Sequence, residues 1–226
     1  MKLTNVMMSA VLLFTASMAT RAEGTPEGLL DLQEAWAAAN YQTPPQEQKQ
    51  AFNALEERAD ALIVQNPGRV EPMIWKAIVL STEAGIVGGF GALSKAKSAR
   101  DLLLRAEAIQ PDALNGSIYT SLGSLYYKVP GWPIGFGDRD KAESYLKKAL
   151  ALNADGIDPN YFYADFLFES GHYEEARQYA EHALAAPLRA GRPVADAGRR
   201  QEVSALMEKL DHKLAASGTS GQMKKS

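Results

Sequence analysis

The stretch AESYLKKALALNA (142–154) is one of three segments that share a single pattern. ARDLLLRAEAIQP (99–111) and ARQYAEHALAAP (176–187) also begin with an alanine and carry a second alanine seven residues later. Seven residues make about two turns of an α-helix, so both alanines of a segment lie on the same helix face. Side chains this small let a neighbouring helix approach closely. The pattern predicts three equivalent helices, each packed through its alanine face.

A further helical segment precedes each of these three. The middle copy follows the pattern W-x2-L-G-x2-Y, with tyrosine in place of tryptophan, at Tyr119, Leu122, Gly123 and Tyr126. The last copy, YFYADFLFESGHYEEA (161–176), keeps the same spacing, and Trp75 and Ile78 hold the leading positions of the first. The pairs resemble the tetratricopeptide repeat (TPR), a helix–turn–helix unit of 34 residues.

These observations predict an all-α fold, an antiparallel helix-pair (TPR-like) solenoid with a C-terminal capping helix. Three TPR-like repeats are predicted over residues 71–187, after N-terminal helices over 23–70. The capping helix is predicted at 188–215, where Val203, Leu206, Leu210 and Leu214 form an apolar stripe on an otherwise polar helix. The polar residues 216–226 are predicted to form a disordered tail.

Two of the three repeats are longer than the standard unit. In both, the alanine that begins the second helix comes seven or eight residues late, after a glycine-rich stretch. The sequence therefore predicts inserted loops at 85–97 and 129–139, the second built from VPGWPIGFGD (129–138). Both fall between the two helices of a repeat, on one edge of the solenoid.

The N-terminus predicts export. Lys2 precedes an apolar run of the length of a signal peptide, too short to span a bilayer. Small residues at Thr20 and Ala22 indicate a signal peptide over residues 1–22, cleaved near Ala22, with cleavage after Ala19 and an uncleaved anchor as alternatives. The predicted location is the periplasm.

Composition and motifs argue against catalysis. The sequence has no cysteine, and its three histidines lack the spacing of a helical metal pair. The stretch GGFGALSK lacks the spacing of a phosphate-binding loop. The net charge is −3, and the one arginine-rich stretch, 189–200, is interleaved with Asp196 and lacks aromatic neighbours, which excludes nucleic acid as the favoured partner. No enzyme activity, metal or cofactor is predicted.

The repeat positions that line the concave groove of such a solenoid are the predicted binding residues. They are Lys76, Leu80, Thr120, Ser124, Tyr127, Tyr161, Phe162, Asp165 and Phe168. The inserted loop is predicted to add a wall made of Trp132, Ile134 and Phe136. Whether this groove is open, or covered by the loops or the capping helix, is left undecided by the sequence.

A looser resemblance rests on Tyr126 through Asp138, with Lys141, Ala142 and Leu150. Here the chain is similar to the T-component family of TRAP transporters, which implies a helical repeat that holds a hydrophobic ligand beside a periplasmic binding protein. That family usually bears a lipoprotein cysteine, which this sequence lacks. The favoured function is a non-catalytic periplasmic module that recruits a protein or peptide through its groove; the alternative is a carrier of a small hydrophobic ligand.

Overall fold

The computed structural model describes residues 24–223, so the predicted signal peptide lies outside the described residues. Within that range the chain forms nine α-helices and no β-strand. The helices are α1 (Leu29–Tyr41), α2 (Pro45–Gln65), α3 (Glu71–Val87), α4 (Gly89–Ile109), α5 (Ser117–Lys128), α6 (Arg139–Leu152), α7 (Ile157–Glu169), α8 (Tyr173–Ala185) and α9 (Pro193–Met223). None of these described helices combines the length and the apolar character that crossing a membrane requires.

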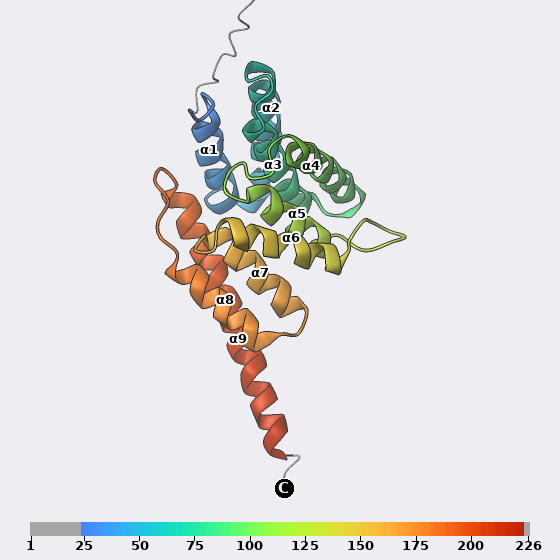
Figure 1. Ribbon diagram of the computed structural model, residues 1–226, viewed down its shortest axis with the longest axis vertical. Coiled ribbons are helices and arrows are strands. Elements are labelled where there is room, and N and C mark those ends of the chain that lie inside the picture. The colour runs from blue at the N-terminus through green and yellow to red at the C-terminus, as the bar shows by residue number, and fades with distance from the viewer. Residues whose placement is uncertain (1–23, 224–226) are drawn as a thin grey trace, which may run out of the picture.

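Consecutive helices pair and stack into a curved solenoid (Figure 1). The odd-numbered helices contact one another in order, from α1 to α9. Within the described range, the even-numbered helices make no such contacts with one another, which is the arrangement expected for the outer side of a curved stack. The all-α helix-pair solenoid predicted from the sequence is confirmed.

The alanine faces pack as the repeat pattern predicted. All six paired alanines of α4, α6 and α8 are buried: Ala99, Ala106, Ala142, Ala149, Ala176 and Ala183. Gly123 of α5 likewise lets α5 and α6 pack closely, because a Cβ added there would lie 2.6 Å from Cγ of Leu146 on α6. Close approach of the two helices of a repeat therefore depends on these small residues.

The loop predicted at 85–97 is wrong. α3 continues to Val87 and α4 begins at Gly89, so Gly88 alone joins them, with a positive φ of 62°. The additional residues lengthen both helices, because Ala92, Ala96 and Ala99 recur at helical spacing and pack toward the core.

The second inserted loop is present. α5 ends at Lys128 and α6 begins at Arg139, so the loop spans 129–138. The N-cap is Asp138, whose side chain accepts a hydrogen bond from the backbone N–H of Lys141 at 3.1 Å. The sequence also holds a D-x-x-E capping pattern from Asp140 to Glu143, but α6 already begins at Arg139, so this pattern does not cap it.

The capping helix differs from its predicted bounds. α9 begins at Pro193, not at 188, because Gly191 turns the chain with a positive φ of 71° and proline suits the first helical position. The residues from 216 to Met223, predicted as a disordered tail, continue α9 as helix, and 224–226 lie outside the described residues.

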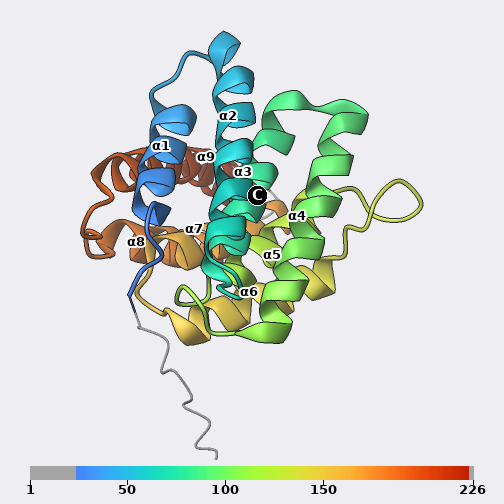
Figure 2. The ribbon, with the colours of Figure 1, turned by 90° about the horizontal axis from the view of Figure 1, so that it is seen from above.

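The first and last helices meet. Viewed from above, α1 lies beside α9, and the two are in contact (Figure 2). Gly198 of α9 permits this contact, since a Cβ added there would lie 2.3 Å from Cγ of Tyr41 on α1. The curvature of the solenoid therefore brings its two ends together.

Candidate functional site

Three of the predicted groove residues are not on the surface. Leu80, Thr120 and Tyr127 are buried. Thr120 donates its hydroxyl proton to the carbonyl of Gly116 at 3.2 Å, inside its own helix. The expectation that these three side chains line an exposed groove is corrected, because the inner helices approach one another closely enough to enclose them.

The aromatic wall predicted on α7 is covered by α9. The guanidinium of Arg199 lies 4.6 Å from the ring centroids of both Tyr161 and Phe162. Such a cation over two rings is attracted by the negative charge of the ring faces. The sequence left undecided whether the groove is open or covered. At these two rings it is covered, by Arg199 of the capping helix α9.

The remaining groove residues lie along the inner helices. Asp165 of α7 accepts a hydrogen bond from the hydroxyl of Tyr127 at 2.8 Å and lies 2.7 Å from Nζ of Lys128. Burial and the carboxylate of Asp165 raise the pKa of Tyr127. Ser124 and Phe168 are half-buried, and Lys76 forms an ion pair with Asp60. The binding role of these residues stays a prediction.

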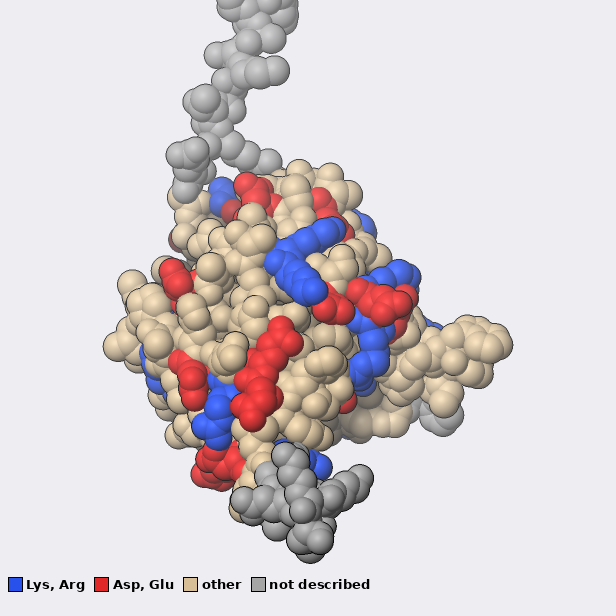
Figure 3. All heavy atoms as spheres, turned by 60° about the horizontal axis from the view of Figure 1, so that its bottom comes forward, with Lys and Arg blue, Asp and Glu red and all other residues tan. Residues whose placement is uncertain are grey.

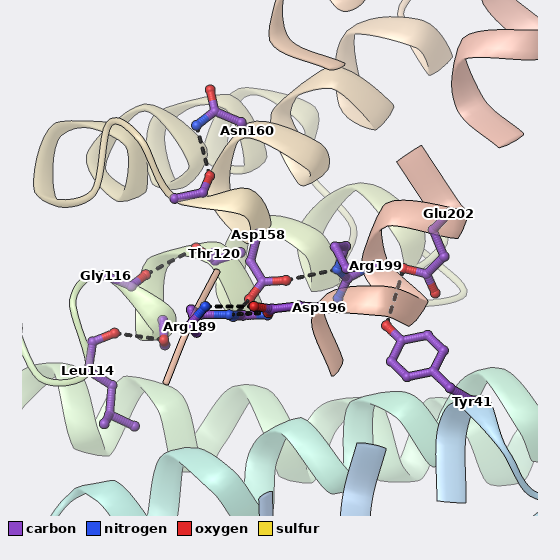
Figure 4. Close-up of polar contacts among 12 residues, drawn as sticks. Tyr41, Leu114, Gly116, Thr120, Asp158, Asn160, Arg189, Asp196, Arg199 and Glu202 are labelled. Atoms are coloured by element: carbon purple, nitrogen blue, oxygen red, sulfur yellow. Dashed lines mark hydrogen bonds and ion pairs between the residues drawn. The ribbon is translucent and has the colours of Figure 1, made fainter. Parts of the chain in front are cut away.

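A cluster of ion pairs lies where α1, α7, α9 and the segment before α9 meet (Figure 4). We call it the closure cluster: Tyr41, Asp158, Arg189, Asp196, Arg199 and Glu202. Asp158 pairs with Nη1 of Arg189 at 2.5 Å and with Nε of Arg199 at 2.8 Å. Arg189 also donates two hydrogen bonds to the buried carboxylate of Asp196, from Nε at 2.6 Å and from the backbone N–H of Arg189 at 2.7 Å.

The closure cluster extends to α1 through Glu202. Arg199 pairs with Glu202, and the hydroxyl of Tyr41 donates to the same carboxylate at 3.4 Å. Burial opposes the ionisation of Asp158, but Arg199, Arg189 and Arg192 outweigh it and hold the pKa of Asp158 well below its usual value. Burial raises the pKa of Tyr41 to about 12 and also raises the pKa of Glu202. The chemistry of this cluster is ion pairing between helices.

The loop at 129–138 presents apolar side chains to solvent. Trp132 is 90% exposed and Ile134 is 69% exposed. Phe136 instead packs against the body, edge-on to Tyr126, with the guanidinium of Arg100 4.4 Å from its ring centroid. In the space-filling view the loop projects from the side of the molecule, and its projecting part carries no charged side chain (Figure 3).

The neck of this loop is closed by backbone contacts. The N–H of Gly137 donates to the carbonyl of Pro130 at 2.9 Å, and that of Asp138 donates to the carbonyl of Tyr126 at 2.8 Å. A Cβ on Gly137 would lie 1.9 Å from the carbonyl oxygen of Val129. The two sides of the neck therefore meet at a distance that only glycine allows.

Comparison with known proteins agrees with this geometry. Residues 134–189 match the family model of the tetratricopeptide repeat. Over this stretch the chain therefore matches the tetratricopeptide repeat. Among solved structures it is similar to a thermophilic TPR protein of Thermus thermophilus, at 20% sequence identity and a TM-score of 0.53, over 79% of this chain and 88% of that one. The comparison with curated proteins found no match to this chain.

The helical solenoid of this chain differs from a solenoid with an open concave surface, because α9 contacts α1 on its inner side. Solenoids usually present an extended concave surface. Here α9 reaches α1, and the closure cluster joins the two helices through Glu202 and Tyr41. The exposed apolar side chains of the loop at 129–138 stand away from that cluster, on the edge where the two helices of a repeat are joined.

The arginine-rich stretch 189–200 is evident in the sequence, but the partners of its arginines are not. Arg189, Arg192 and Arg199 follow one another with Asp196 between them, which was a signal for internal ion pairs. Arg200, from the same stretch, donates to the carbonyl of Ala186 at 2.6 Å, at the end of α8. Tyr41 and Asp158 gave no such signal, because their partners are far away in the sequence.

The described part of the chain offers no group of three or more His, Cys, Asp or Glu side chains placed to hold a metal ion. His182 lies at the surface, 3.1 Å from Asp155. Neither Trp132 nor Phe136 lines the cavity beside α8 or the cavity beside the start of α9. The alternative of a small hydrophobic ligand stays a prediction.

Proposed function

We propose that this TPR protein is a non-catalytic binding module that docks onto a protein partner through the tip of its loop at 129–138. The observation that carries the proposal is the exposure of Trp132 and Ile134 on a loop whose neck is closed by hydrogen bonds. TPR repeats generally mediate protein–protein interactions, which supports the same role. The occupant that fits this tip is a protein with an apolar pocket.

Physical chemistry favours such a tip as an anchor. Tryptophan is enriched among the residues that dominate binding energy at interfaces, where it fills a pocket on the partner. A loop that is already ordered loses little conformational entropy when it binds. Burial of Trp132 and Ile134 would also remove from water the most exposed large apolar side chains of the loop.

This proposal moves the main contact away from the groove. The sequence pointed to Tyr161 and Phe162, but the side chain of Arg199 covers both rings. Phe168 and Ser124 are half-buried and offer less apolar area than the loop tip. A groove contact is therefore the alternative outcome of the test below.

The experiment places a photo-crosslinking amino acid at position 132 in cells that make the protein. A discrete crosslinked partner is expected from position 132 and none from position 64, where Val64 is similarly exposed on α2. In Trp132→Ala/Ile134→Ala the complex should be lost while the melting temperature stays unchanged. Retention of the complex in that variant, with its loss in Tyr161→Ala/Phe168→Ala, would assign binding to the groove instead.

We also propose that the protein acts in the periplasm, on the support of the signal-peptide pattern in residues 1–22. The test is the intact mass of the protein recovered from fractionated cells. A periplasmic species that begins at Glu23 is expected. A full-length species confined to the cytoplasm would contradict the proposal.

A further inference from the structure

A cavity of about 240 Å³ lies between α1 and the start of α9. Gln33, Glu34 and Ala37 line it from α1, and the chain from Gly191 to Ala195 lines it from the other side. The volume exceeds that of the cavity of about 150 Å³ that holds benzene, and it is below the range of drug-sized pockets. Its size suits a small organic molecule.

Arg192 brings a positive charge without a hydrogen-bonded partner to this cavity. Its side chain makes no hydrogen bond within the described residues, and its Nε is buried without a partner. Asp158 and Asp196, the two carboxylates whose charges act on Arg192, are both bonded to Arg189. The guanidinium of Arg192 lies 5.1 Å from the ring centroid of Trp75, which fixes its position without neutralising it.

The first turn of α9 adds donors to the same cavity. Pro193, the first residue of α9, has no N–H. The first backbone N–H of α9 that donates within the described residues is that of Asp196, to the carbonyl of Arg192 at 3.0 Å. The N–H groups of Val194 and Ala195 thus have no acceptor among the described residues, and both residues line the cavity. The amino end of a helix attracts negative charge through such groups.

Gln33 adds a second polar side chain to the lining of the cavity. Its side chain is only 8% exposed and lines the cavity, yet the described residues give its amide no hydrogen-bond partner. Its amide N–H can donate to an anion that Arg192 attracts.

We propose that this cavity binds a small organic carboxylate, which pairs with Arg192 and accepts hydrogen bonds from Gln33 and from the first turn of α9. Ala37 and Val194 supply apolar walls for the rest of the molecule. The exposed carboxylate of Glu34 at the edge disfavours a second negative charge, so a monocarboxylate fits better than inorganic phosphate. The site is separate from the loop at 129–138 and does not depend on the function proposed for that loop.

The test is a ligand-observed NMR titration of the protein with three probes. Benzoate is expected to bind saturably, benzyl alcohol has a similar size without the charge, and inorganic phosphate has the charge without the apolar part. Benzoate should bind at least tenfold more tightly than either. Equal binding of benzyl alcohol, or tighter binding of phosphate, would overturn the proposal, as would no saturable binding of benzoate.

Two variants locate the binding. Arg192→Gln should weaken benzoate at least tenfold, because a charge-assisted hydrogen bond is lost. Arg105→Gln, which removes an exposed arginine of α4, should leave benzoate binding unchanged. If Arg192→Gln does not fold, Gln33→Leu serves instead and should also weaken binding. Unchanged affinity in the variant that folds would overturn the assignment.

Discussion

At the scale of single residues, Gly137 decides whether the loop can keep its shape. A Cβ at this position would meet the carbonyl oxygen of Val129 at 1.9 Å and the carbonyl carbon of Pro130 at 2.9 Å. Both contacts are with backbone, which cannot move aside as the end of a side chain can. The loop neck must therefore open if any other residue is placed there.

Gly137→Ala should lower the free energy of unfolding by about 1–3 kcal/mol, which corresponds to a loss of several degrees in Tm. Differential scanning calorimetry measures this. The control is Gly85→Ala in α3, where an added Cβ meets nothing within 4 Å and should stabilise the helix by up to about 1 kcal/mol. Equal melting temperatures for the two variants would contradict the described neck.

Asp158 is the second residue with a measurable consequence. Because its pKa is lowered in the folded protein, its ionised form stabilises the fold above the usual value of 3.8, and this contribution is lost as the pH falls below about 4. Asp158→Asn should lower Tm by about 5–10 °C at pH 7, since it removes one carboxylate that pairs with both Arg189 and Arg199. The difference between wild type and variant should shrink between about pH 4 and pH 2.

Thermal melts across this pH range check the expectation, with the exposed Asp112→Asn as control. A difference that is the same at pH 7 and at pH 2 would show that the ion pairs of Asp158 add no pH dependence.

At the scale of elements, the alanine faces of α6 and α8 set how closely the helices of the solenoid pack. Ala142→Trp and Ala176→Trp should each lower Tm by several degrees, because both positions are fully buried and have no room for a larger side chain. Ala151→Trp, on the exposed side of α6, should leave Tm within about 2 °C of wild type. Unchanged melting of both buried variants would contradict the packing.

The same elements show what a sequence can predict. Helix positions and buried alanine faces follow from local periodicity. The sequence therefore predicts that the segments of α4 to α8 are helical and which face of α4, α6 and α8 is buried. The segment at 85–97 was predicted as a loop because its glycines outweighed the helical spacing of Ala92 and Ala96. Long α3 and α4 instead meet across Gly88, and Lys95 then reaches the carboxylate of Glu83, which is only 1% exposed, at 2.8 Å.

The candidate sites were less predictable, for a physical reason. The apolar residues Trp132 and Ile134 could be named from the sequence, because a loop that interrupts a helix pair must lie at the surface. The closure cluster and the cavity beside Arg192 depend on the contact between α1 and α9, which are separated by most of the chain. No local pattern reports a contact over that distance.

At the scale of the whole molecule, one close contact holds the two ends together. Gly198→Ala should destabilise the protein by about 1–3 kcal/mol, because the new methyl group meets the ring of Tyr41. In a Tyr41→Ala background the ring is absent, so the same change should cost much less. Chemical denaturation of the four proteins of this double-mutant cycle gives the coupling energy. Additive effects would contradict a direct contact.

The meeting of α1 and α9 also changes how the molecule comes apart. In an open solenoid each repeat touches only its neighbours, so the terminal repeats can fray while the middle stays folded. Here the first helix is itself a neighbour of the last, through Tyr41, Arg199 and Glu202. Unfolding of α1 therefore also breaks contacts of α9, so we expect the two helices to open as one cooperative unit. Amide hydrogens in α1 and in the first half of α9 should then exchange with solvent at similar rates.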